Sequence, residues 1–374
     1  MARPIIRTAL ITAALTLAGQ AASARAEGPK LVATIPPLAG IASDILSGVA
    51  EPTLLIDNGG SPHAYSLRPS DARALTNADY VLWVGEGLEL FLADKLDTLA
   101  PSATEIEAMN LPGMTLMPYR KAEEHHHEHD EHADHDDHDD HDHDHADHDE
   151  DHHAEHEHDD HDHEEHAHGD HDDHDEHEHG EHEHGEHDHA EHDHDHHGHH
   201  HTGNDAHVWL SPDNAVAIAR GIAAAVSKDL PAAEAARVSS NLANFESDIA
   251  ELKRVIAAQL KPYAERPYLT FHDAYQYFET GFGLDYHGSV TVSPEVQPGA
   301  ATLSELREEI EEHDIVCIFS EPQFEPRAIR VIAENLPVRT GVLDPLGDSD
   351  TARIGGYQAL LTGLADSYTD CLGQ

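Results

Sequence analysis

The sequence predicts an α/β protein with two lobes, a long helix between them and a disordered insertion in the first lobe. Three observations support this class. Apolar strand patterns alternate with helix patterns in both halves of the chain, which is typical of parallel α/β layers. One apolar stripe continues at helical spacing for roughly 30 residues. Residues 123–201 contain only His, Asp, Glu, Ala and Gly.

The first lobe is expected over residues 27–230. Its strands are the apolar segments 31–35, 53–56 and 80–84, each ended by proline or glycine. Its helices are expected at 39–46, after the cap Ser70-Asp71, and from Gly85 toward Leu99. A further helix begins at Ser211-Pro212, because serine caps a helix and proline fits its first turn.

A linking helix is expected over residues 231–262. Its apolar residues recur three or four apart and are Val238, Leu242, Phe245, Ile249, Leu252, Ile256 and Leu260. This spacing places them on one helix face. A helix of this length measures about 45 Å and could connect two lobes as a stiff strut. An ordinary helix packed within one domain has the same pattern, so both interpretations remain open here.

The second lobe is expected over residues 263–374, where the alternation of strands and helices returns. Its predicted strands are 268–271, 315–319 and 338–343, and its predicted helices are 303–310 and 352–368. Because the same alternation occurs in both halves, the sequence indicates two α/β lobes of similar design.

The insertion at 123–201 has 34 His and 36 acidic residues among its 79 positions. It cannot bury enough apolar surface to offset the entropy of ordering the chain, so we expect it to be disordered. The whole chain has a formal net charge of −53 with His neutral. Such a charge repels phosphates and excludes nucleic acid as a partner.

The N-terminus predicts an exported protein. Arg3 and Arg7 precede the apolar stretch 9–18, and Ala24-Arg25-Ala26 has the small residues of a cleavage site. Residues 1–26 are therefore interpreted as a signal peptide, and the mature protein as a soluble periplasmic protein of Gram-negative type. The alternative is a buried first helix.

Cys317 and Cys371 are the only two cysteines. In an exported chain two cysteines favour one disulfide. It would close a loop of about 55 residues, worth about 4 kcal/mol on the chain-entropy model. Two free thiols or two metal ligands remain the alternative.

Five histidines lie outside the insertion. Ligands in α/β proteins gather beyond the carboxyl ends of strands, and two of the five histidines follow predicted strands. His63 is in the loop after strand 53–56, His272 directly follows strand 268–271, and His207 lies between the insertion and a helix. Asp344 follows strand 338–343. These four side chains could converge in one crevice. A histidine after a strand is more commonly an ordinary surface residue, so position alone is weak support.

The remaining candidates are given structural roles. His287 and His313 have no comparable context and are interpreted as structural or surface residues. Glu321 also follows a strand, and we favour a role beside a metal ligand over direct contact with a metal.

Six segments resemble zinc-specific periplasmic binding proteins of ABC importers, the ZnuA family. They are 59–71, 206–212, 271–278, 294–299, 320–324 and 343–347. The resemblance covers nearly all of the mature chain outside the insertion. The position of the insertion also matches the family's His-rich loop.

The resemblance implies two Rossmann-like lobes joined by one long rigid helix, with Zn²⁺ bound between them. By motif, His63, His207 and His272 are the implied ligands. Pro62 departs from the family pattern, because some members carry at this position a glutamate that supplies an oxygen ligand. Proline has no such oxygen, so the implied fourth ligand is water or Asp344. Manganese relatives carry glutamate in place of His272. The resemblance also implies a disulfide between the two cysteines.

The function expected from this family is capture of Zn²⁺ by a monomer that delivers it to a membrane ABC permease with a cytoplasmic ATPase. The chain lacks a His-Glu-x-x-His motif, so we expect no enzyme activity. The histidines from His125 to His201 are expected to bind Zn²⁺ weakly and exchangeably, either to pass it on or only to buffer or sense it. The alternatives are a stand-alone metal-sequestering or adhesion protein and a manganese-binding relative.

Overall fold

The computed structural model describes residues 28–57, 59–120, 203–291, 293–325 and 327–373. The predicted signal peptide at 1–26 and the whole insertion at 123–201 lie outside these ranges. In the part of the chain that is described, no helix is long and apolar enough to cross a membrane.

The first lobe contains a parallel four-stranded sheet in the order β2-β1-β3-β4. Its strands are β1 (Leu31–Ala33), β2 (Thr53–Leu54), β3 (Tyr80–Trp83) and β4 (Thr104–Glu107). The two central strands, β1 and β3, are buried at every position, as expected for a parallel sheet covered on both faces. The helices are α1 (Pro36–Ile45), α2 (Pro69–Thr76), α3 (Leu90–Ala93), α4 (Leu96–Leu99) and α5 (Pro212–Val226).

Helices α1 and α2 begin earlier than expected, at Pro36 and Pro69, and two further features differ from the prediction. The helix expected toward Leu99 is two short helices, α3 and α4, that meet at Asp94 and Lys95. The edge strand β4 was not predicted, because only Ile106 of its four residues is both apolar and buried. A strand with only one buried apolar side chain lacks the run of apolar residues by which a central strand is predicted.

The second lobe has a second parallel sheet with the equivalent order, β6-β5-β7-β8. Its strands are β5 (Tyr268–His272), β6 (Tyr286–Thr291), β7 (Cys317–Ser320) and β8 (Arg339–Val342). Its helices are α7 (Gln276–Phe282), α8 (Ala300–Glu312), α9 (Arg327–Ala333) and α10 (Gly356–Leu372). Three of these elements, β6, α7 and α9, were not predicted from the sequence. The α/β class with two lobes is confirmed.

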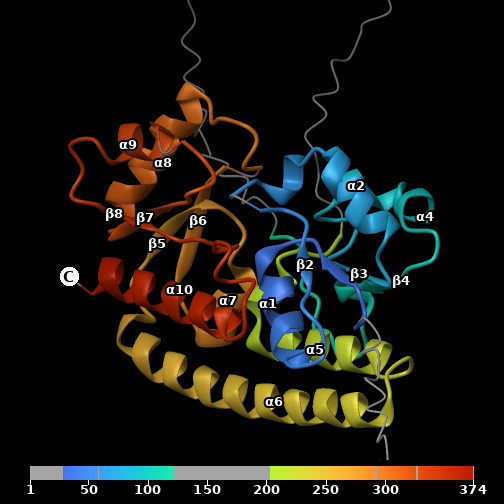
Figure 1. Cartoon of the computed structure of the whole chain (residues 1–374). Coiled ribbons are helices and arrows are strands. Elements are labelled where there is room, and N and C mark those ends of the chain that lie inside the picture. The colour runs from blue at the N-terminus through green and yellow to red at the C-terminus, as the bar shows by residue number, and fades with distance from the viewer. Residues whose placement is uncertain (1–27, 58, 121–202, 292, 326, 374) are drawn as a thin grey trace, which may run out of the picture. The chain divides into compact units, whose positions relative to one another are not determined.

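Helix α6 (Ala232–Leu260) is 29 residues long and packs on both lobes. It contacts α1 and α5 of the first lobe and α7 and α10 of the second, and it runs beneath both lobes in Figure 1. Phe245 belongs to one continuous buried apolar cluster that also contains Leu31 and Tyr268, one from each sheet. The long helix is therefore both a connector and part of a shared core, which makes the junction between the lobes stiff.

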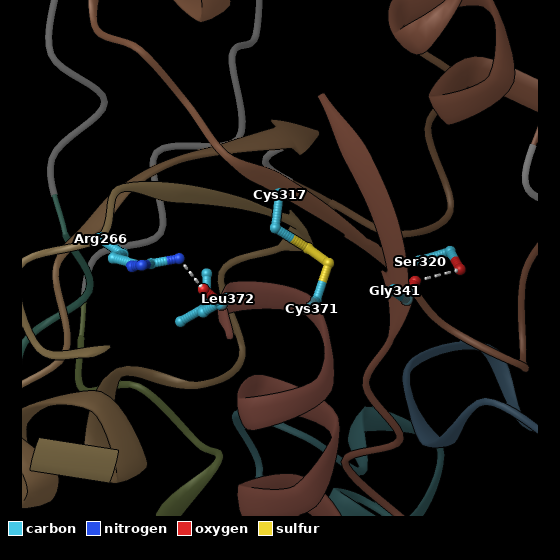
Figure 2. Close-up of a disulfide and its surroundings, with 6 residues drawn as sticks. All are labelled: Arg266, Cys317, Ser320, Gly341, Cys371 and Leu372. Carbon is cyan, nitrogen blue, oxygen red and sulfur yellow. Dashed lines mark hydrogen bonds between the residues drawn. A yellow bond between two sulfur atoms is a disulfide. The ribbon is translucent and has the colours of Figure 1, made fainter. Parts of the chain in front are cut away.

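Cys317 and Cys371 form a disulfide, with their Cα atoms 6.0 Å apart. Figure 2 shows that it ties the start of β7 to the end of α10. Beside it, the Arg266 guanidinium donates to the carbonyl oxygen of Leu372. The end of the C-terminal helix is thus fixed to the second sheet at the amino end of its strands.

Candidate metal centre

Three short structural features place His63, His207 and His272. His63 lies in a 3₁₀ turn, Pro62–Ala64, that follows β2. His207 precedes the 3₁₀ turn Val208–Leu210, which leads into α5. His272 is the last residue of β5.

The three imidazoles meet at one point. One ring nitrogen from each of His63, His207 and His272 lies within 4.8 Å of the other two. The ring centroids are 5.4 Å apart for His63 and His207, 5.8 Å for His63 and His272, and 5.3 Å for His207 and His272. The structure therefore brings together the three histidines that the sequence analysis selected.

Two buried carboxylates determine which ring nitrogens face the centre. The Nδ1 atom of His207 is 2.7 Å from Oδ1 of Asp205, and Nδ1 of His272 is 2.6 Å from Oε1 of Glu321. Ionised carboxylates only accept hydrogen bonds, so each Nδ1 carries the proton and donates it. Each Nε2 then presents a lone pair, the arrangement by which proteins orient histidine ligands toward a metal.

The spacing of these lone pairs suits a metal ion. The two Nε2 atoms of His207 and His272 are 3.4 Å apart. At this distance the two nitrogens can share a proton, with one Nε2–H donating to the other Nε2, or they can bind one metal cation in its place. In a tetrahedral zinc site with Zn–N bonds of about 2.0–2.1 Å, two ligand nitrogens are about 3.3–3.4 Å apart. The geometry already matches that of two imidazoles on one zinc ion.

His272 is tuned by its charged neighbours. Burial alone would lower its pKa, but the carboxylates of Glu321, Asp273 and Asp205 outweigh burial and raise the pKa above its usual value. The surroundings therefore favour positive charge at this ring. A bound dication would be stabilised there for the same reason.

The centre is small and largely apolar in its lining. A cavity of about 10 Å³ is bounded by the three imidazoles and by Trp209, Phe324, Pro345 and Leu346 among others, which is the space of one water-sized particle. Trp209 also donates from Nε1 to the carbonyl of Pro345 at 2.7 Å, which holds the two lobes together beside the cavity. Charges in such a site interact strongly because little water screens them.

Comparison with known proteins assigns the family. The family model described as "ZnuA: Zinc-uptake complex component A periplasmic" matches residues 31–371. The chain is 38% identical over 366 residues to the high-affinity zinc uptake system protein ZnuA of Brucella suis, covering 98% of each chain. It is 40% identical over 372 residues to the protein of the same name from Haemophilus influenzae, covering 100% of each. The chain belongs to the ZnuA family.

The fold agrees with that of a solved ZnuA. A crystal structure of ZnuA aligns with a TM-score of 0.63 at 18% identity, covering 91% of this chain and 100% of the other. At this identity the match concerns the fold alone. Membership of the ZnuA family makes the chain a periplasmic component of a zinc-uptake complex, a class of solute-binding proteins and not of enzymes.

Asp344 does not join the three imidazoles in this ZnuA-family structure. Its Oδ1 accepts hydrogen bonds from Gln323 Nε2 at 2.8 Å and from the backbone N–H groups of Leu346 and Gly347 at 3.1 and 2.9 Å. The carboxylate lines a neighbouring cavity of about 290 Å³. Asp344 thus stabilises the turn after β8.

The sequence analysis missed the role of Asp205. This carboxylate also accepts a hydrogen bond from the backbone N–H of His207 at 2.9 Å, so it fixes both the ring and the backbone of that residue. A signal was present, since Asp205 and His207 are two residues apart and a short acidic side chain can turn back at that spacing. The position of Glu321 beside His272 agrees with the supporting role favoured for it.

Proposed function

We propose that this protein captures Zn²⁺ in the periplasm at His63, His207 and His272 and delivers it to an ABC-type membrane permease. One observation carries the assignment of the site. Two imidazoles, each held by a buried carboxylate, direct their Nε2 lone pairs at one point, with a third imidazole beside them. A metal cation at that point would be bound by ring nitrogens that the carboxylates already orient.

The donor atoms favour zinc over manganese. Three neutral imidazole nitrogens suit a borderline ion such as Zn²⁺, whereas Mn²⁺ prefers carboxylate and water oxygens. The two carboxylates nearest the rings, Asp205 and Glu321, accept hydrogen bonds from Nδ1 atoms and serve to orient the rings. The manganese-binding alternative therefore has less support.

Water is the better candidate for the fourth ligand. Pro62, next to His63, has no side-chain oxygen to offer. Three hydrogen bonds to Oδ1 hold the carboxylate of Asp344 in the turn after β8. A site with three protein ligands and one water is a common zinc arrangement, and a replaceable water suits a protein that must release its ion.

The remaining parts of the proposal concern export and delivery. We infer that residues 1–26 are a signal peptide that is cleaved on export. We also infer that the lobes span 27–230 and 263–374, that the helix 231–262 joins them, and that the protein acts as a monomer. The permease with its cytoplasmic ATPase would dock on both lobes and weaken the site between them. The histidines from His125 to His201 would hold further Zn²⁺ weakly and exchangeably.

The test of the site is a set of single substitutions in the full chain. His63→Ala, His207→Ala and His272→Ala should each lower the affinity for the tightest zinc equivalent at least about 10-fold, measured by competition with a zinc chelator. Glu325→Ala, at an exposed residue of the second lobe, is the control and should leave that equivalent unchanged. Unchanged tight affinity in all three variants would refute the assignment.

The coupling to import needs a separate test. A strain lacking this gene should grow poorly when zinc is chelated, and growth should return with the wild-type gene but not with His272→Ala. Normal growth of the deletion strain under zinc limitation would favour the stand-alone sequestering or adhesion role.

A further inference from the structure

A second group of metal-binding side chains lies in the second lobe. His287 is on β6, Glu309 is on α8, and His313 is the residue that caps the end of α8. One ligand atom from each lies within 4.8 Å of the other two. His287 Nε2 is 3.2 Å and His313 Nε2 is 3.9 Å from the same carboxylate oxygen, Oε1 of Glu309.

This group, the His287–Glu309–His313 cluster, is separate from the first centre. In the pairing of β5 with β6, His272 lies opposite Thr291. Thr291 is four residues further along β6 than His287. At about 3.3 Å per residue, the two levels are about 13 Å apart along the strands. One centre is at the carboxyl end of this sheet and the other near its amino end, so they cannot share an ion.

The separations within the cluster are near those of a tetrahedral site. Bonds of about 2.0–2.2 Å to nitrogen and oxygen require neighbouring ligand atoms about 3.3–3.5 Å apart. The observed 3.2 and 3.9 Å therefore need only small side-chain rotations to admit an ion. The centroids of the two rings are 4.4 Å apart, and both rings place Nε2 near the same carboxylate oxygen.

The local charge also favours a cation. Helix α8 carries five glutamates and one arginine. That arginine, Arg307, donates to the carbonyls of Val331 and Ile332 and so is engaged elsewhere. The cluster is at the C-terminal end of α8, where the helix dipole attracts positive charge.

We propose that the His287–Glu309–His313 cluster is a second binding site for Zn²⁺ or a similar borderline transition-metal dication, completed by water. The side chains of His287, Glu309 and His313 are 26%, 19% and 49% exposed. Water can therefore compete for the ion, and the site binds more weakly than the buried centre. The inference does not depend on the proposed function, since its ligands are a different set.

The experiment is histidine footprinting of the full chain with diethyl pyrocarbonate, read by mass spectrometry at each histidine, over a series of buffered free Zn²⁺ concentrations. Zinc should slow modification of His287 and His313 together, with one midpoint, at a higher free concentration than fills the tightest zinc equivalent in chelator competition. Mg²⁺ should protect neither, because it prefers oxygen ligands.

Variants separate a shared ion from two independent contacts. His313→Ala should raise the midpoint for protection of His287 at least about 10-fold, and Glu309→Gln should raise it for both histidines. Glu325→Gln, on an exposed residue of the same lobe, is the control and should change neither. No zinc protection of His287 and His313 in the wild-type chain, or protection of His287 that is unchanged by His313→Ala, would overturn the proposal and leave a hydrogen-bonded surface cluster.

Discussion

Glu321→Gln tests whether the carboxylate beside His272 supports zinc binding. Glu321 is 3% exposed, and its Oε1 accepts from Nδ1 of His272 at 2.6 Å. Its other oxygen, Oε2, has no hydrogen-bond partner among the described residues. Glutamine preserves the size of the side chain and an acceptor for Nδ1 but removes the charge. The variant therefore isolates the electrostatic contribution.

The magnitude follows from the geometry. An ion bound to Nε2 of His272 would lie about 6 Å from the carboxylate, across the ring. A dication and a unit charge at that distance interact by about 5 kcal/mol at an effective dielectric constant near 20. The retained hydrogen bond and the easier burial of a neutral amide reduce this value. We expect a loss of 10- to 100-fold in affinity, or about 1.4–2.7 kcal/mol.

The assay is chelator competition for the tightest zinc equivalent of the full chain. Glu325→Gln makes the same chemical change on a side chain that is 76% exposed and is the control. An affinity unchanged in Glu321→Gln, or lowered equally in both variants, would refute the reasoning that the buried carboxylate stabilises the bound ion.

Three further predictions concern pH and stability. Because the pKa of His272 is raised, protons should begin to displace zinc at a pH above the usual histidine range. Chelator competition at a series of pH values should show that zinc loss begins at a lower pH in Glu321→Gln than in the wild type. Zinc loss that begins at the same pH in both proteins would contradict the assignment. Replacing Cys317 and Cys371 with serine should lower the free energy of unfolding in urea by about 4 kcal/mol and leave tight zinc affinity unchanged, whereas lost tight binding would show that the disulfide shapes the site. Burial raises the pKa of Glu89 to about 7, so its contribution to stability is full below its ordinary value of 4.5 and is lost as pH rises through about 7. Glu89→Gln should therefore gain up to about 3 kcal/mol relative to wild type between about pH 5 and pH 8 in urea unfolding, and parallel pH profiles would contradict this.

The sequence predicted the central strands well because burial on both faces gives them apolar runs, as in β1 and β3. The edge strands β4 and β6 were not predicted because their residues are partly exposed and largely polar, so they form no apolar run. The class of fold does not depend on edge strands, so it could still be predicted.

The convergence of His63, His207 and His272 agrees with the expectation, which placed His63 and His272 beyond the carboxyl ends of strands. The hydrogen-bond partners of His207 and His272 were not identified, although a supporting role was expected for Glu321. The pairing of His272 with Glu321 joins residues 49 apart and depends on how β5 and β7 align. The His287–Glu309–His313 cluster was missed because it joins α8 to β6, a strand that the sequence did not reveal. Asp344 shows the same limit, since position alone could not tell that the turn after β8 engages its carboxylate.

The most direct test of the central claim is an anomalous difference map at the zinc absorption edge, from crystals of the full chain grown with zinc. The account predicts a peak at about 2.0–2.1 Å from one ring nitrogen of His63 and from Nε2 of both His207 and His272. No peak at this point, or an ion held there without one of the three imidazoles, would contradict it.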